Sequence, residues 1–337
     1  MGVNVKQLML VGKDNVELQD AIVSVEIGDF LVRNRYSLIS PGTELALFTG
    51  THIGFTDPEI TWARYPLRPG YSSVGTIETA GCDAKGFMEG ERVLHFQPHA
   101  NHSVVTPDRD LIFRLPAGLD EKKALFARFG QIAYTAVAAS DIRDGYVLVL
   151  GGGIVGNLCA QLFQARRGRK VIVADIAQSR VTLALQSGIG SATCSSVCDL
   201  CEALLEATGG EGVSTVVEAT GVPNLVTDAL NLVNRLGEVI LLGSTRGKVE
   251  LDVYKLIHRK AIKVIGAHES RYPLFADPSL CASHKFFGYD VLSMIADGTL
   301  KVDRFITDIV SPADVGTAYH LLLDDRDNHL GILIDWK

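Results

Sequence analysis

A buried strand followed by three spaced glycines constrains this chain more than any other feature. The apolar run Tyr146–Leu150 predicts a parallel strand that is covered on both faces. Gly151, Gly153 and Gly156 follow at the G-x-G-x-x-G spacing, and the residues after them have helical apolar spacing. Such glycines permit a tight turn, the approach of a pyrophosphate and close packing of helix on strand. The stretch therefore predicts a dinucleotide-binding turn, with Ile154 and Val155 inside it.

An acidic residue stands where this turn would need one. A second apolar strand ends at Asp175, about 20 residues after the last glycine, where a carboxylate meets the adenosine ribose. A carboxylate accepts hydrogen bonds from ribose hydroxyls and repels a 2′-phosphate, so the predicted cofactor is NAD. Arg180 keeps NADP open as an alternative, because a nearby arginine could receive that phosphate.

The order of elements predicts an α/β fold with a doubly wound parallel sheet. Strand-like runs at residues 146–150, 171–175, 214–218, 238–242 and 261–266 alternate with helical segments. Residues 1–120 instead contain short strand-like runs between turn signals, which predicts a β-rich domain. We expect three parts: 1–120 as this domain, 121–274 as the nucleotide-binding domain, and 275–337 as a segment that returns to the first.

Small residues follow the ends of the later strands. Ligands of doubly wound sheets bind at the carboxyl ends of strands, so these residues would leave room for a cofactor. Ordinary tight turns explain each of them equally well. They are Ala219, Thr220, Gly243, Ser244, Ala267 and His268.

Composition excludes several classes of partner and site. The net charge is −7 and no run of basic residues occurs, which argues against nucleic acid or an anionic membrane as a partner. The N-terminus lacks the pattern of a signal peptide. Six cysteines in a chain of 337 residues indicate a reducing compartment with free thiols, so we expect a cytoplasmic location.

Taken together, the parts resemble the medium-chain dehydrogenase/reductase superfamily over essentially the whole chain. The glycine turn, residues 90–93 (Gly-Glu-Arg-Val), residues 134–136 (Tyr-Thr-Ala) and residues 217–221 (Val-Glu-Ala-Thr-Gly) carry the resemblance. It implies a GroES-like catalytic domain, a Rossmann domain, and hydride transfer between NAD(P) and an alcohol, ketone, quinone or enone. It also implies that Thr135 touches the nicotinamide ribose.

The zinc-ligand positions of this superfamily depart from the pattern. They hold Ser40, Tyr71 and Gln131, and zinc prefers thiolate, imidazole or carboxylate ligands. The four-cysteine structural zinc lobe is also missing. The flanking segments resemble a zinc-lacking subgroup that includes the bacteriochlorophyllide hydroxyethyl dehydrogenase, so no metal is expected.

A cluster of histidines leaves the chemistry of the site open. His95, His99 and His102 are close enough in sequence for a metal site. On a strand, however, His99 and His102 would point to opposite faces, and a turn at Pro98 breaks the regularity, so we do not expect a shared ligand set. In the superfamily this segment borders the substrate. We therefore expect His99, or failing that His95, to be the acid–base group, with Tyr71 orienting the substrate oxygen. A solvated loop histidine is the alternative.

The favoured function is a zinc-independent, NAD(H)-dependent oxidoreductase for a secondary alcohol or its ketone in specialised metabolism. The alternatives are a metal-free quinone or enone reductase, and a dinucleotide-binding homologue without catalysis. Residues 51–66 form an insert that either borders the substrate or is a solvated loop. Residues 249–253 and 261–266 lie at the expected outer edge of the sheet, so a homodimer is expected.

Overall fold

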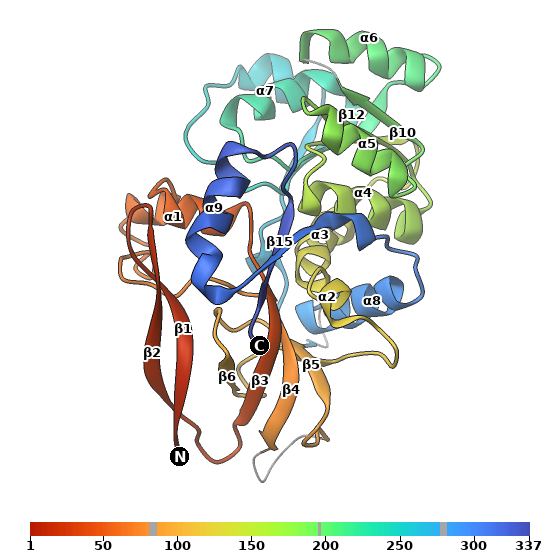
Figure 1. Ribbon diagram of the computed structural model, residues 1–337. Coiled ribbons are helices and arrows are strands. Elements are labelled where there is room, and N and C mark those ends of the chain that lie inside the picture. The colour runs from red at the N-terminus through yellow and green to blue at the C-terminus, as the bar shows by residue number, and fades with distance from the viewer. Residues whose placement is uncertain (81–85, 195–196, 277–281) are drawn as a thin grey trace. The chain divides into compact units, whose positions relative to one another are not determined.

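The computed structural model describes residues 1–80, 86–194, 197–276 and 282–337 (Figure 1). The chain divides into two compact units. The first contains Met1–Arg128, Leu292–Ala296 and Val302–Lys337, and the second contains Phe129–Val291 and Asp297–Lys301. Among the described residues, no helix is long and apolar enough to cross a membrane.

The first unit is built on a mainly antiparallel sheet. Its described strands pair in the order β14-β15-β3-β4-β5-β7, with β6 on the other part of β3, and only β14 and β15 run parallel. The hairpin of β1 and β2 forms a separate small sheet. The strands are β1 (Gly2–Gly12), β2 (Asn15–Ser24), β3 (Phe30–Leu38), β4 (Ser73–Ala80), β5 (Arg92–His95), β6 (His102–Val105), β7 (Ile112–Arg114), β14 (Ile306–Val310) and β15 (Gly331–Asp335).

Two helices close the core of this unit. α1 (Thr43–Phe48) and α9 (Val315–Asp324) lie side by side in Figure 1, and the rings of Phe48 and Tyr319 meet with centroids 4.8 Å apart. Both rings are almost completely buried, together with Leu8, Leu10 and Ile332 of neighbouring strands. The C-terminal residues therefore complete a core that the N-terminal residues begin, which fixes the position of the loop before α1.

Helical structure around residue 120 is more broken than its periodicity predicts. The segment 120–139 reads as one helix, but the structure has α2 (Glu121–Ala124) and α3 (Ala127–Ala139). Asp120 caps α2 by accepting a hydrogen bond from the Lys122 N–H at 2.9 Å. The break falls at Leu125 and Phe126, whose side chains are fully buried, so tertiary packing overrides the local helical pattern there.

The second unit contains the parallel sheet. Its described strands run in the order β10-β9-β8-β11-β12-β13, which is the strand order of a doubly wound dinucleotide-binding fold and confirms the α/β prediction. The strands are β8 (Tyr146–Leu150), β9 (Lys170–Asp175), β10 (Ser191–Cys194), β11 (Val213–Glu218), β12 (Val233–Leu241) and β13 (Lys263–Gly266). The helices are α4 (Ile154–Arg167), α5 (Gln178–Gln186), α6 (Val197–Ala207) and α7 (Pro223–Leu232), and α8 (His284–Ala296) has residues in both units.

Buried polar residues form hydrogen bonds at the amino ends of the strands of this sheet. Arg169 is 4% exposed, and its guanidinium donates hydrogen bonds to the carbonyls of Ile142 and Gly145, each at 2.8 Å. Glu238 is fully buried and accepts a hydrogen bond from the Thr215 hydroxyl at 3.0 Å. These bonds satisfy charges that burial would otherwise penalise, and they leave the opposite, carboxyl end of the sheet free to form a site.

Candidate active site

The order of strands places the candidate nucleotide site between β8 and β11. Strand order reverses there, and ligands of open α/β sheets bind outside the carboxyl ends of strands at such a point. Gly151 leaves β8 with φ of 101°, a conformation that favours glycine. A Cβ on Gly156 would lie 1.9 Å from the Gly151 carbonyl oxygen, whereas a Cβ on Gly153 would meet nothing within 4 Å. The first and third glycines therefore shape the turn, and the second leaves an open approach to the N-terminus of α4.

Asp175 is joined to this turn by hydrogen bonds. Its Oδ2 accepts from the Gly152 N–H at 2.7 Å, and its Oδ1 accepts from the Ala177 N–H at 2.9 Å. The carboxylate is thus fixed at the end of β9, beside the glycine turn, where the sequence predicts the ribose contact. Arg180 of α5 also lies at the turn, because a Cβ on Gly152 would come within 3.1 Å of the Arg180 Cβ. Both residues that bear on the choice between NAD and NADP are therefore adjacent to one glycine.

Loops after the other strands meet the same region of the sheet. A Cβ on Gly151 would come within 2.8 Å of the Thr220 methyl group, which places the loop after β11 against the glycine turn. A Cβ on Gly243 would lie 2.3 Å from the Gly221 nitrogen, so the loop after β12 packs against the loop after β11. Ala219 and Ser244 belong to these two loops, and their contact with a cofactor remains a prediction.

Of three other expected residues of the second unit, Thr135 and Gln131 are fully buried and His268 is exposed, and all three are hydrogen-bonded. The Thr135 hydroxyl is 2.8 Å from the carbonyl oxygen of Ala267, which ties α3 to the loop after β13. His268 follows Ala267 and accepts a hydrogen bond from the Ser270 N–H at 3.1 Å. Gln131, also fully buried, donates through Nε2 to the His284 carbonyl at 2.7 Å. The proposed ribose contact of Thr135 remains a prediction.

In the first unit, Ser40 and Tyr71 are brought together. The Ser40 hydroxyl and the Tyr71 phenol form a hydrogen bond, and the Arg128 guanidinium lies over the Tyr71 ring at 5.3 Å. The same guanidinium lies 4.7 Å from the centre of the Phe96 ring. Burial raises the pKa of Tyr71 above its usual value, although its hydrogen bonds and Arg128 act in the opposite direction. The phenol is therefore protonated near neutral pH and can donate a hydrogen bond.

Glu44 is the centre of a buried polar network behind this pair. Its Oε1 accepts from the Ser40 N–H at 2.8 Å, and its Oε2 accepts from the Tyr319 hydroxyl and from His99 Nε2, each at 2.9 Å. His99 Nδ1 lies 2.8 Å from the Ser37 hydroxyl. Glu44 and His99 are both completely buried. The carboxylate thus fixes the backbone of Ser40 and the orientation of the His99 ring together.

The three expected histidines have different surroundings. His95 is fully buried, and its Nδ1 accepts from the Gln97 N–H at 3.3 Å, so its Nε2 donates to Asn34 Oδ1 at 2.8 Å. This burial lowers the pKa of His95 to about 3, so the ring is neutral at neutral pH. His102 Nε2 lies 3.2 Å from Glu78 Oε2. The three rings therefore contact different partners, and the catalytic roles of His99 and His95 stay predictions.

The residues at the superfamily's metal positions do not suit a zinc ion. A serine hydroxyl, a phenol with a raised pKa and a carboxamide lack the thiolate, imidazole and carboxylate groups that zinc prefers. Within the described residues, no group of three or more His, Cys, Asp or Glu side chains could hold a metal ion.

Glu44, Phe96 and Arg128 were not among the residues expected at this site. Glu44 is the last residue of the segment 39–44 that resembles the zinc-lacking subgroup, but a single acidic residue gives no sign of burial. Its partner Tyr319 is 275 residues away in sequence. An arginine directly after an apolar helix start could have been noticed as a cation near the site, although only the folded chain shows its aromatic neighbours.

Several known proteins with similar sequences are dehydrogenases. Residues 155–277 match a family described as zinc-binding dehydrogenase. An L-threonine 3-dehydrogenase of Anaeromyxobacter sp. (strain K) is 26% identical over 285 residues, covering 71% of this chain and 82% of that protein. The 2-desacetyl-2-hydroxyethyl bacteriochlorophyllide A dehydrogenase of Rhodobacter capsulatus is 27% identical over 327 residues, covering 92% and 91%.

Solved structures share the fold along nearly the whole chain. A short chain alcohol dehydrogenase from E. coli, complexed with cofactor NADH, has a TM-score of 0.81 at 18% identity and covers 98% of this chain and 99% of its own. The 2R,3R-butanediol dehydrogenase from Bacillus subtilis has a TM-score of 0.80 at 18% identity, with coverage of 98% and 99%. At such identities the similarity concerns the fold.

Proposed function

We propose that this chain is a zinc-independent, NAD(H)-dependent oxidoreductase of the medium-chain dehydrogenase/reductase superfamily that interconverts a secondary alcohol and its ketone. The observation that carries the proposal is the glycine turn at the strand-order reversal, with Asp175 bonded to the Gly152 N–H. Both named relatives are dehydrogenases, one of L-threonine at position 3 and one of a hydroxyethyl bacteriochlorophyllide, and these names support an alcohol substrate for this chain. A role in specialised metabolism is part of the proposal.

The bound nicotinamide would supply the hydride donor or acceptor, and this chain would handle the proton. Tyr71 donates its phenolic proton to the ketone oxygen during reduction, because its raised pKa keeps the phenol protonated. Ser40 orients the phenol through their hydrogen bond, and Arg128 stabilises the negative charge that develops on the Tyr71 oxygen. In the oxidation of an alcohol, the same oxygen accepts the proton.

In this proposal His99 does not contact the substrate but positions Ser40 through Glu44. The Glu44 carboxylate bonds both to His99 and to the Ser40 N–H, so the histidine helps to position Ser40. Direct acid–base work by His99, which the sequence favours, would require the ring to leave two hydrogen bonds and a fully buried position. Comparison of His99→Ala with Tyr71→Phe separates the two roles. Direct catalysis predicts that His99→Ala loses at least about 100-fold in kcat, whereas positioning predicts a smaller loss.

Activity with a panel of small secondary alcohols and their ketones tests the function. Turnover is followed by the absorbance of reduced nicotinamide with NADH and NADPH, and the metal content of the same preparation is measured. We expect turnover with NADH and no stoichiometric zinc. Activity that a chelator abolishes and zinc restores would show the metal-free assignment to be wrong. Dinucleotide binding without turnover of any carbonyl would favour the non-catalytic alternative.

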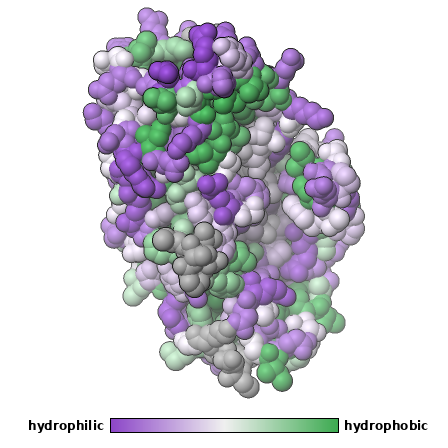
Figure 2. Space-filling view, turned by 180° about the vertical axis from the view of Figure 1, so that it is seen from behind, coloured by the Kyte–Doolittle hydropathy of each residue, from purple (hydrophilic) through white to green (hydrophobic). Residues whose placement is uncertain are grey.

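We further propose a homodimer in the cytoplasm. β13 is the edge strand of the parallel sheet as described, and its Val264 is 43% exposed. Val253 and Tyr254, which precede it in sequence, are each more than half exposed. Figure 2 shows apolar surface gathered on the upper part of the face that it displays. Such an edge can pair with its own copy. Light scattering over a range of concentrations tests the dimer.

Cys159, Cys194 and Cys201 are free thiols, which supports a reducing compartment.

A further inference from the structure

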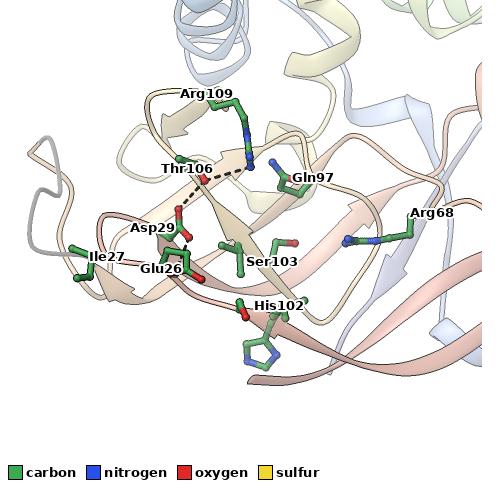
Figure 3. Close-up of a pocket in the computed structure, with 12 residues that line it drawn as sticks. Glu26, Ile27, Asp29, Arg68, Gln97, His102, Ser103, Thr106 and Arg109 are labelled. Carbon is green, nitrogen blue, oxygen red and sulfur yellow. Dashed lines mark hydrogen bonds between the residues drawn. The ribbon is translucent and has the colours of Figure 1, made fainter. Parts of the chain in front are cut away.

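A cavity of about 560 Å³ lies in the first unit, away from the residues assigned to catalysis. Its wall includes Glu26, Arg68, Gln97, Ser103 and Arg109 (Figure 3), whereas Ser40, Tyr71, Phe96 and Arg128 do not line it. We call it the β6 cavity, because Ser103 and its neighbours in β6 form its floor. Its volume falls within the range of about 300–1,000 Å³ that is common for small-molecule sites.

Three polar side chains point toward the middle of the β6 cavity. In Figure 3, Arg68 enters from one side, and Gln97 and Arg109 enter from above. Arg109 already has protein partners, since its Nε donates to Asp110 Oδ1 at 3.1 Å. Among the residues that the structure describes, the Arg68 guanidinium and the Gln97 carboxamide have no hydrogen-bond or ion-pair partner. Their donors are available to a ligand.

The acidic residues of the wall form no ion pair with Arg68. The Asp29 carboxylate accepts hydrogen bonds from the Glu26 N–H at 2.9 Å and from the Thr106 hydroxyl at 2.7 Å instead. The Glu26 side chain is exposed and forms no ion pair with a described residue. Arg68 is an exposed residue, and partial burial of its guanidinium lowers its pKa. No described residue forms an ion pair with it, and a bound anion would supply the missing counter-charge.

The donors and the wall together indicate the chemistry of the ligand. A guanidinium presents parallel N–H groups that match a carboxylate in two hydrogen bonds, and a carboxamide adds a further N–H donor. Val23 and Val104 provide apolar wall for a carbon skeleton. We propose that the β6 cavity binds a small organic molecule through its carboxylate, with Arg68 as the main contact and Gln97 as a second donor. This site is independent of the proposed catalytic activity.

Calorimetric titration with sodium butyrate, sodium succinate and inorganic phosphate tests this site. We expect the two carboxylates to bind the wild-type chain and phosphate to bind more weakly. Arg68→Gln should weaken carboxylate binding at least about tenfold, because it removes a charged hydrogen-bond donor. Gln97→Ala should weaken binding by about threefold, as expected for one neutral donor. The matched control is Arg33→Gln, since Arg33 is exposed, pairs with Glu78 and does not line the cavity.

Several results would overturn the proposal. One is the absence of carboxylate binding to the wild-type chain, and another is equal affinity in the wild type and Arg68→Gln. If phosphate binds through Arg68 and the carboxylates do not bind, the carboxylate assignment is wrong and the cavity is a site for a tetrahedral anion. If Arg68→Gln does not fold, Arg68→Lys is the alternative variant, because it keeps the charge but removes the parallel N–H groups of the guanidinium. An unchanged carboxylate affinity in Arg68→Lys would also overturn the assignment. Tyr71→Phe should bind the carboxylates as the wild type does.

Discussion

Replacement of Glu44 by glutamine should destabilise the first unit strongly. The carboxylate receives hydrogen bonds from the Ser40 N–H, His99 Nε2 and the Tyr319 hydroxyl, and it is fully buried. In Glu44→Gln, the amide oxygen can still accept from the Ser40 N–H. The new NH2 group then faces two side chains that had donated hydrogen bonds to Oε2, so both contacts must be rearranged.

The magnitude follows from those two contacts. A hydrogen bond to a charged group contributes about 1.5–3 kcal/mol, and two such bonds are disturbed. His99 and Tyr319 recover part of this by exchanging donor and acceptor roles, since both can also accept. We therefore expect the free energy of unfolding to fall by about 3 kcal/mol in Glu44→Gln. Tyr319→Phe removes one donor and keeps the ring packed on Phe48, so its cost should be about 1 kcal/mol.

Urea unfolding followed by tryptophan fluorescence measures this loss selectively. The chain has two tryptophans, Trp62 and Trp336, and both belong to the first unit. Trp336 is 9% exposed, and its indole N–H donates to the Ser37 hydroxyl at 2.9 Å, beside His99. Its emission therefore reports the unit that contains the network. A loss below about 1 kcal/mol in Glu44→Gln, or a loss no larger than that of Tyr319→Phe, would refute the reasoning.

Three further predictions concern the nucleotide turn and the proton donor. Gly156→Ala should destabilise the second unit and abolish NADH binding, because its Cβ would lie 1.9 Å from the Gly151 oxygen. Gly153→Ala should leave the thermal stability unchanged, because its Cβ would meet nothing within 4 Å, and should weaken only the NADH binding measured by fluorescence titration. Asp175→Ser should raise the affinity for NADPH relative to NADH, and tighter NADPH binding by the wild type would contradict the assignment of NAD. Tyr71→Phe should lower kcat for ketone reduction by at least about 100-fold. In the wild type this kcat should stay constant through neutral pH and fall only as the pH rises above about 10, because reduction needs the protonated phenol and burial raises its pKa.

The sequence by itself determined the nucleotide-binding half of the molecule. Its signals are local: a strand buried on both faces is apolar throughout, and a turn at φ of 101° requires a glycine at position 151 whatever the rest of the chain does. Asp175 could be identified for the same reason, since its distance from the glycines is set by one strand–helix–strand unit. Among the described strands of this half, β10 was missed, because its four residues, Ser191–Cys194, have neither length nor an apolar pattern.

Tertiary structure alone decided which polar residues of the first unit act together. The sequence shows three nearby histidines, but their rings contact Asn34, Glu44 and Glu78, which belong to different segments. Whether a carboxylate is exposed or is the centre of a network depends on residues brought from the other end of the chain. The same holds for Arg68, whose neighbours in sequence give no sign that its guanidinium enters a cavity. Tertiary packing decides which polar groups far apart in sequence form hydrogen bonds with each other, and the local sequence pattern does not predict these pairs.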